Sequence, residues 1–358
     1  MKAVLSAVIL VGVLALTLSD RQPTQAGPPP VPAAPPVLVR APVAKDKPDP
    51  LAKEVQAAQE KGIKYLKEAL RDQAGGMWSW DDPTLGVLQK GGPSALAALA
   101  LLESGVKVDD QSMRRAFPYL RSVEPENTYV VSLLTQVFCK ANQKEDADRI
   151  QRNVRWLEDA ASWKGDQLQG WSYGSAGGAA GRADNSNTRY AVAALHAAHR
   201  AGFKVSKDGF WDAVRAHYVR TQAADGGWTY SPGAGRPTHT MTVSGLLCLS
   251  LSGEVIGKDD KATEAARNGG YGWVANNFRL QNSPHTFYNF DVIAALGRAS
   301  GKKEFGTKDK NLEWYRLGAE WLHKNQKPDG KWMIDDALDK FPVVSTAFAL
   351  RFLASRPD

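Results

Sequence analysis

Cysteine is almost absent from this chain, which has only Cys139 and Cys248 in 358 residues. Each lies inside an apolar run with helical spacing, so we interpret both as small buried hydrophobic residues. This interpretation excludes a disulfide framework and a cysteine metal pair. We therefore expect that neither the fold nor the function depends on oxidation.

The chain also lacks blocks of basic residues and any sustained alternation of polar and apolar residues. Lys and Arg exceed Asp and Glu by seven, but the excess is spread among acidic neighbours. This argues against nucleic acid as a partner, because nucleic-acid sites concentrate basic residues on one face. The missing period of two argues against extended sheets, so we expect an all-α protein.

Two segments precede the part of the chain that can form a core. Residues 1–26 are typical of a secretory signal peptide, with a basic start, an apolar run over residues 3–18 and small residues before Gly27. The alternative is an uncleaved anchor, which would be the protein's only membrane contact. Residues 27–50 are rich in Pro, Ala and Val, as in an extended linker. We expect an exported protein, periplasmic or extracellular, or one anchored by its N-terminal segment.

A motif of Gln, a glycine turn and Trp recurs along residues 51–358. Residues 222–228 read Gln-Ala-Ala-Asp-Gly-Gly-Trp, and residues 326–332 read Gln-Lys-Pro-Asp-Gly-Lys-Trp. Looser copies end at Trp78 and Trp171. The Trp spacings are multiples of roughly 50 residues, which indicates an array in which two units are degenerate. We expect glycine to end a helix, Asp-Gly to turn the chain, and Trp to plug the turn.

This motif resembles the repeats of squalene cyclases and protein prenyltransferase β-subunits. The resemblance implies a single (α/α)6 toroid, in which amphipathic outer helices surround apolar inner helices. The hydrophobic pattern places the outer helices at residues 51–70, 113–123, 146–157, 210–221, 263–278 and 312–325. It places the inner helices at residues 94–102, 128–141, 187–201, 240–251, 287–299 and 344–354.

Polar residues just before the inner helices are the candidates for a functional site, since the ends of these helices face the central cavity of such a ring. Three groups stand out in the sequence. The candidates for lining the cavity are Asp184, Asn187, Arg189 and Tyr190 in the first group, Arg236, Thr238 and His239 in the second, and His285, Phe287, Tyr288 and Asp291 in the third.

The first group falls where class II terpene cyclases carry Asp-x-Asp-Asp-Thr, whose central Asp protonates an alkene or epoxide. Here Ser186 and Asn187 stand at the second and third Asp positions, while Asp184 and Thr188 are retained. A hydroxyl or an amide cannot reach the acidity of a clustered carboxylic acid. We therefore interpret Asp184 and Asn187 as residues that cap a helix.

The other two groups resemble the zinc site of protein prenyltransferases, which combines an Asp-x-Cys pair with the His of a His-Thr-Cys-Tyr segment. Residues 285–288, His-Thr-Phe-Tyr, match that segment. Arg236 and Thr238 stand at the Asp and Cys positions, where a cation repels the metal and a neutral hydroxyl binds it poorly. We expect no zinc and no other cofactor. No spacing supports a rearranged site made of His239, His285 and Asp291.

The sequence leaves three functions open. The first is an exported toroid that binds an apolar or isoprenoid-like ligand, or a partner, through its central cavity without cyclase or prenyltransferase activity. The second is an isoprenoid-processing enzyme with a non-standard active site. The third is a polysaccharide lyase or glycosidase, whose paired carboxylates would come from Asp291 and from Asp335 and Asp336.

Overall fold

The computed structural model describes residues 50–73, 76–85, 90–174, 182–282, 285–306 and 312–357. The predicted signal peptide and the predicted linker, apart from its last residue, lie outside these ranges. Among the helices that the structure describes, none is both long and apolar enough to span a membrane.

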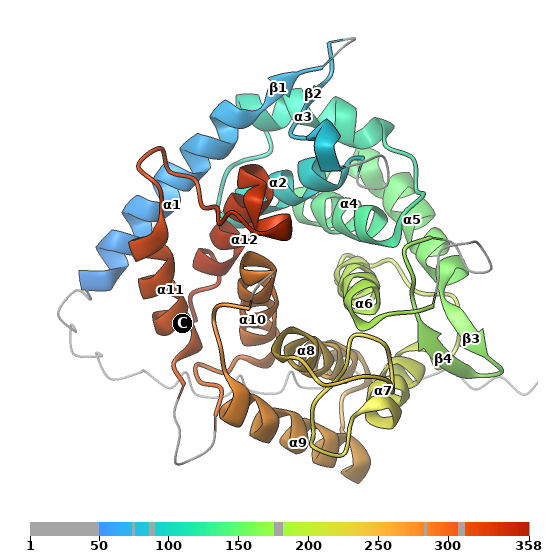
Figure 1. The fold of residues 1–358 in the computed structure, drawn as a ribbon. Helices are drawn as coiled ribbons and strands as arrows, with labels where there is room; N and C mark the ends of the chain where they lie inside the picture. The colour runs from blue at the N-terminus through green and yellow to red at the C-terminus, as the bar shows by residue number, and fades with distance from the viewer. Residues whose placement is uncertain are drawn as a thin grey trace, which may run out of the picture. The chain divides into compact units, whose positions relative to one another are not determined.

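Twelve α-helices account for most of the described chain, and they alternate between an outer and an inner ring (Figure 1). The outer helices are α1 (Pro50–Ala69), α3 (Gln111–Ser122), α5 (Ala147–Ala160), α7 (Phe210–Thr221), α9 (Lys261–Asn277) and α11 (Trp314–Asn325). The inner helices are α2 (Gly92–Glu103), α4 (Thr128–Ala141), α6 (Asn185–Arg200), α8 (His239–Ile256), α10 (Thr286–Ser300) and α12 (Pro342–Leu353).

The inner ring is closed. Each inner helix packs against the next inner helix in the chain, and α12 returns to α2. In the outer ring, α11 lies against α1. The predicted all-α toroid of six helix pairs is confirmed, and the bounds of α4 and α7 agree with the prediction to the residue.

Burial explains which helices form which ring. From Gly92 to Leu102, α2 is buried at every residue, as expected for a helix that is apolar on all sides. The outer helix α5 buries one face, formed by Ile150, Val154 and Leu157, whereas Asp148 is exposed and Arg152 is half-buried. In these two helices, burial on all sides or on one face matches the place of the helix in the ring.

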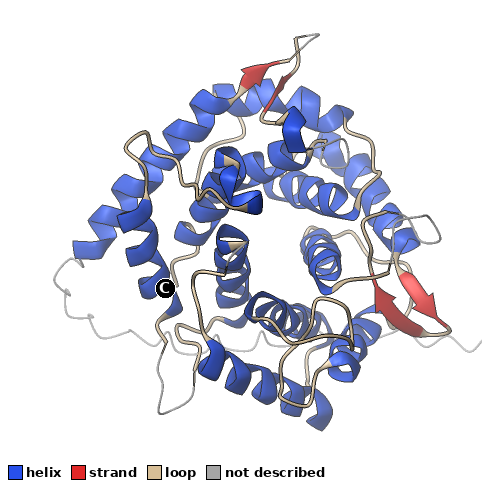
Figure 2. Ribbon diagram, in the orientation of Figure 1, coloured by secondary structure: helices blue, strands red, loops and turns tan. Residues whose placement is uncertain are grey.

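Two short antiparallel hairpins, which the sequence did not predict, interrupt the helical pattern (Figure 2). The first pairs β1 (Arg71–Asp72) with β2 (Trp78–Ser79), and the second pairs β3 (Ser162–Lys164) with β4 (Gln167–Gly170). Each hairpin connects an outer helix to the turn that precedes the next inner helix. Strands of two to four residues are too short to show the alternation by which strands are predicted.

Four fully or almost fully buried Trp side chains plug equivalent turns between outer and inner helices. Each indole Nε1 donates to a carbonyl near the end of the preceding outer helix, and each Trp backbone N–H donates to a hydroxyl of the following inner helix. The indole bonds run from Trp80 to Leu66 (2.6 Å), Trp171 to Leu157 (2.7 Å), Trp228 to Tyr218 (2.9 Å) and Trp332 to Leu322 (2.8 Å). The hydroxyl partners are Ser94, Thr188, Thr242 and Thr346.

These contacts confirm the plug predicted for Trp171, Trp228 and Trp332. In the first repeat the prediction of Trp78 was wrong, because Trp80 makes the equivalent bonds. Trp78 lies in β2, half-buried, with the guanidinium of Arg115 4.3 Å from the centre of its ring.

The glycine of the Asp-Gly turn is required at two equivalent positions. Gly226 and Gly330 both have φ of +90°, a conformation that favours glycine. A Cβ at Gly226 would lie 2.5 Å from the carbonyl oxygen of Gly269, and a Cβ at Gly330 would lie 2.5 Å from that of Lys61. The turn therefore sits directly against the next outer helix in the ring.

Candidate functional site

A cavity of about 450 Å³ lies at the N-terminal ends of the inner helices, and we call it the central cavity. One wall is apolar and comes from the start of α2 and from α12 and the segment before it, through Leu85, Pro93, Leu338, Val344 and Phe348. The wall from α6, α8 and α10 is mainly polar, through Ser186, Asn187, Thr238, Thr240, Asn282 and His285, and Met241 is an apolar residue within it. The cavity is therefore amphipathic, with apolar residues mainly on the side of α2 and α12 and polar residues mainly on the side of α6, α8 and α10.

Tyrosines join the two walls of the central cavity. Tyr190 and Tyr288 stack with ring centres 5.9 Å apart, and Tyr129 meets Tyr190 edge-on at 4.8 Å. The Tyr288 hydroxyl lies 2.9 Å from the Ser186 hydroxyl. Burial raises the pKa of both Tyr129 and Tyr190, so these phenols stay neutral.

Two more tyrosines at the cavity were not predicted from the sequence. Tyr173 and Tyr230 are exposed, at 42% and 44%, and their hydroxyls lie 3.4 Å apart. Each follows a plug Trp by two residues, after Trp171 and Trp228. The repeated Trp-x-Tyr spacing was the signal that could have found them.

Asp184 caps α6 in the structure. Its Oδ1 accepts the backbone N–H of Asn187 at 2.8 Å, and its Oδ2 accepts the Asn187 side-chain amide at 2.8 Å. Asp184 itself is 4% exposed, and burial raises its pKa. Asn187 and Tyr190 reach the cavity, whereas the carboxyl of Asp184 is not among the cavity-lining groups.

His285 lines the central cavity at the start of α10 but does not cap that helix. The cap comes from Asp339, whose carboxylate accepts the backbone N–H groups of Thr286 (2.6 Å) and Phe287 (3.3 Å). Burial raises the pKa of Asp339 to about 6 and lowers that of His285. At neutral pH the imidazole on this wall is therefore uncharged.

Several of the predicted cavity residues lie elsewhere. Arg236 is exposed in a groove on the outside of the ring, beside Asp225 and Trp273. Phe287 packs against Trp321 of α11, with ring centres 6.0 Å apart, because its position on α10 faces the outer ring. His239 is 2% exposed and lies behind Thr238 and Thr240, which do line the cavity.

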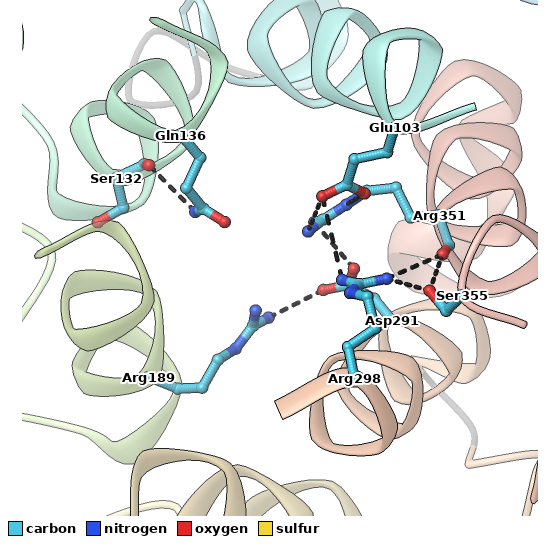
Figure 3. Close-up of polar contacts among 8 residues, drawn as sticks. All are labelled: Glu103, Ser132, Gln136, Arg189, Asp291, Arg298, Arg351 and Ser355. Carbon is cyan, nitrogen blue, oxygen red and sulfur yellow. Dashed lines mark hydrogen bonds and ion pairs between the residues drawn. The ribbon is translucent and has the colours of Figure 1, made fainter. Parts of the chain in front are cut away.

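Arg189 and Asp291 meet in a buried ion network at the centre of the ring (Figure 3). Asp291 pairs with Arg189 at 3.2 Å and with Arg351 at 2.8 Å, and Arg351 also pairs with Glu103 at 2.8 Å. The network thus links α6, α10, α12 and α2. Sequence reasoning missed Glu103 and Arg351, although an arginine inside the apolar run of α12 was a visible signal.

The ion network borders the tyrosines of the central cavity. The guanidinium of Arg189 lies 3.8 Å from the centre of the Tyr190 ring and 5.0 Å from that of Tyr288. Its charge is balanced by Asp291, which is fully buried. Arg189 therefore supports the tyrosine rings from the side of the ion network, and it is not itself a lining residue.

Asp291 and Asp335, two of the three carboxylates predicted for sugar cleavage, do not share a cleft. Asp291 is held in the ion network, while Asp335 lies in an outer groove beside Phe287 and Trp321. Within the part of the chain that the structure describes, no three His, Cys, Asp or Glu residues gather in a way that could hold a metal ion.

No family model and no curated protein matches the sequence. The fold is similar to that of the type II terpene cyclase MstE from Scytonema, with a TM-score of 0.54 and 13% identity over 84% of this chain and 97% of that one. It is also similar to a possible GH105 family member from Klebsiella pneumoniae, with a TM-score of 0.51 and 12% identity over 89% of this chain and 96% of the other. These likenesses establish a shared α/α-toroid fold.

Proposed function

We propose that this protein binds an amphipathic, isoprenoid-like ligand in the central cavity, without cyclising or transferring it. The observation that carries the proposal is the division of the cavity into an apolar wall on α2 and α12 and a hydroxyl and amide wall on α6, α8 and α10. A hydrocarbon chain gains free energy by leaving water for the first wall, and an uncharged polar head can form hydrogen bonds with the second.

The charge of the lining favours an uncharged head group. None of the described residues that line the central cavity is Asp, Glu, Lys or Arg. The buried Arg189 is already paired with Asp291. A diphosphate would thus enter without a cation to balance it, which costs free energy.

The same lining supports binding rather than cyclisation. Cyclisation needs a proton donor strong enough to attack an alkene. Ser186 and Asn187 stand at the second and third Asp positions of the class II cyclase motif, so neither supplies a carboxylic acid. The remaining acid, Asp184, accepts hydrogen bonds from Asn187 with both of its carboxylate oxygens. The MstE structures include a complex with geranylgeranyl dihydroxybenzoate. The hydrocarbon chain of that molecule is of the kind that the apolar wall here would suit, whereas its benzoate carboxylate would find no cation in this lining.

The test combines thermal melting with product analysis. Geranylgeraniol at about 100 times its Kd should raise Tm by about 5 °C and be recovered unchanged by mass spectrometry. Squalene, which has no polar head, and geranylgeranyl diphosphate should raise Tm less. A cyclic or transferred product that disappears in Asp184→Asn would overturn the proposal and establish an enzyme.

A pair of variants localises the binding. Thr238 is exposed at the cavity, so Thr238→Trp should obstruct it and abolish the Tm shift. Lys261 is exposed at the start of α9 in the outer ring, so Lys261→Trp should leave the shift unchanged. Equal shifts in both variants would place the ligand outside the central cavity.

We also propose that the protein is exported and that the mature chain begins near Gly27. The support is the basic start, apolar run and small residues of the N-terminal segment. N-terminal sequencing of protein from its native host tests this proposal. A retained Met1 in a soluble cytoplasmic fraction would contradict it.

A further inference from the structure

A second cavity, of about 310 Å³, lies beside the central cavity where the first and last helix pairs of the ring meet. We call it the side cavity. Its lining residues lie on α1 and just after it (Tyr65, Ala69 and Arg71), within residues 79–85, at Pro93 of α2, and at residues 341–344 at the start of α12. Leu85, Pro93 and Val344 line both cavities. The two cavities are therefore neighbours that share a wall.

The shared wall lies on the apolar side of the central cavity. Leu85, Pro93 and Val344 are three of the five residues that make that side apolar. Beyond them the side cavity continues with apolar side chains, among them Pro83, Phe341 and Val343. Apolar side chains thus continue from the central cavity along one side of the side cavity, whose other lining residues include Tyr65, Arg71 and Ser79.

The acidic groups of the side cavity are already engaged in the local fold. Asp81 accepts hydrogen bonds from the backbone N–H of Gly91 (2.6 Å), from the Ser94 hydroxyl (2.7 Å) and from the Tyr119 hydroxyl (2.5 Å). Asp82 accepts from the backbone N–H and the hydroxyl of Thr84. These hydrogen bonds tie the two carboxylates to Thr84, Gly91, Ser94 and Tyr119, so both are engaged within the fold. Arg71 and the apolar side chains also line the side cavity.

We infer that the side cavity is a tail compartment of the same binding site, which takes the far end of a hydrocarbon chain whose polar head lies on α6, α8 and α10. This inference rests on the function proposed above. A head on the polar wall directs its chain toward Leu85, Pro93 and Val344. A chain that exceeds the central cavity then extends past these residues, and its length determines how much of the side cavity it fills.

The test measures affinity along a series of alcohols, geraniol, farnesol and geranylgeraniol, in which each member is longer by one isoprene unit. In the wild-type protein the affinity should rise at least about tenfold from farnesol to geranylgeraniol, because the added unit is buried in the side cavity. Leu85 is half-buried in a short 3-10 helix between the two cavities. Leu85→Trp should therefore obstruct the way from the central cavity into the side cavity without disturbing the ring of helices. This variant should lose the gain in affinity from farnesol to geranylgeraniol.

A second variant acts from the other side of the boundary. Val343 is half-buried and lines only the side cavity, so Val343→Trp should fill that cavity and produce the same loss for geranylgeraniol. Lys261→Trp, on the exposed face of α9 and outside both cavities, is the control and should keep the wild-type dependence on chain length. If both Trp variants, folded by circular dichroism, keep that dependence, the tail compartment is refuted while binding in the central cavity stands. If no alcohol binds saturably to the wild type, both proposals are refuted.

Discussion

Gln326, at the end of α11, donates its side-chain Nε2 to the carbonyl of Ala58 on α1 at 2.9 Å, across 268 positions of sequence. The same Nε2 donates to the carbonyl of Gly330 in its own turn at 2.8 Å. Gln222 makes the same two contacts inside the chain, to Gly226 at 2.8 Å and to Ala266 on α9 at 2.7 Å. The contact that closes the ring is therefore built like a contact between consecutive repeats.

This equivalence predicts that removing either glutamine lowers the free energy of unfolding by the same amount. Gln326→Ala and Gln222→Ala each remove two hydrogen bonds to part-buried carbonyls, so each should lower the free energy of unfolding by about 1–3 kcal/mol in urea melts. A loss at Gln222 with none at Gln326 would show that the ring closure is not a repeat interface in solution.

Removing a plug Trp should lower the free energy of unfolding by more than removing either glutamine. Trp228→Ala or Trp332→Ala should cost about 3–5 kcal/mol, because each leaves a large cavity and an unpaired carbonyl on the outer helix. Trp78→Ala is the control, since Trp78 is only half-buried and plugs no turn, and it should cost clearly less than either. If urea melts gave similar losses of stability for Trp78→Ala and Trp228→Ala, Trp78 would be as important as a plug residue, which would contradict the assignment of the first plug to Trp80.

The sequence predicted the helices well where apolar spacing and local caps agree. At α4, Asn127 accepts the backbone N–H of Tyr129 just before the apolar run, and the predicted start was correct. At α8 the predicted end at Leu251 came too early. The helix continues to Ile256, and Glu254 pairs with His196 and Arg200 of α6, a contact between helices that spacing within one helix cannot show.

The site was less predictable because its parts come together only when the ring closes. Asn187, Thr238, His285 and Tyr288 were identified because they precede or begin inner helices. One partner of Arg351 is Glu103, 248 positions away, and no local pattern connects the two. The side cavity likewise forms where the first helix pair meets the last.

Asp339 predicts one pH dependence of stability. Its pKa rises from its usual value near 4 in the unfolded chain to about 6 in the folded protein, so the folded state binds the proton more tightly. Its contribution to stability is present below about pH 4 and is lost as the pH rises through 6. Relative to Asp339→Asn, the wild type should be about 2 kcal/mol more stable at pH 4.5 than at pH 7 in urea melts. A difference that does not change with pH would contradict the raised pKa.

The buried His239 predicts a pH dependence of stability opposite in sign to that of Asp339. Its Nδ1 lies 2.8 Å from Oδ1 of Asn289, whose amide nitrogen donates to the carbonyls of Arg279 and Leu280, so Nδ1 carries the proton. Burial lowers the pKa of His239 to about 4. Its contribution is therefore present above about pH 6.5 and is lost as the pH falls toward 4.

His239→Asn retains a donor near Nδ1 but does not titrate. Between pH 7.5 and pH 5, the wild type should lose about 2 kcal/mol more stability than this variant. Chemical unfolding at the two pH values measures the difference. An equal loss in both proteins would show that His239 titrates normally and is not sealed behind the cavity wall.

The most direct test of the proposed function is the stoichiometry of geranylgeraniol binding, measured by native mass spectrometry. The account predicts one ligand per chain in the wild type, none in Ser186→Trp, whose indole would project from the polar wall into the cavity, and one in Lys261→Trp. The absence of a bound ligand in the wild type, or its retention in Ser186→Trp, would contradict the claim that the central cavity is a binding site.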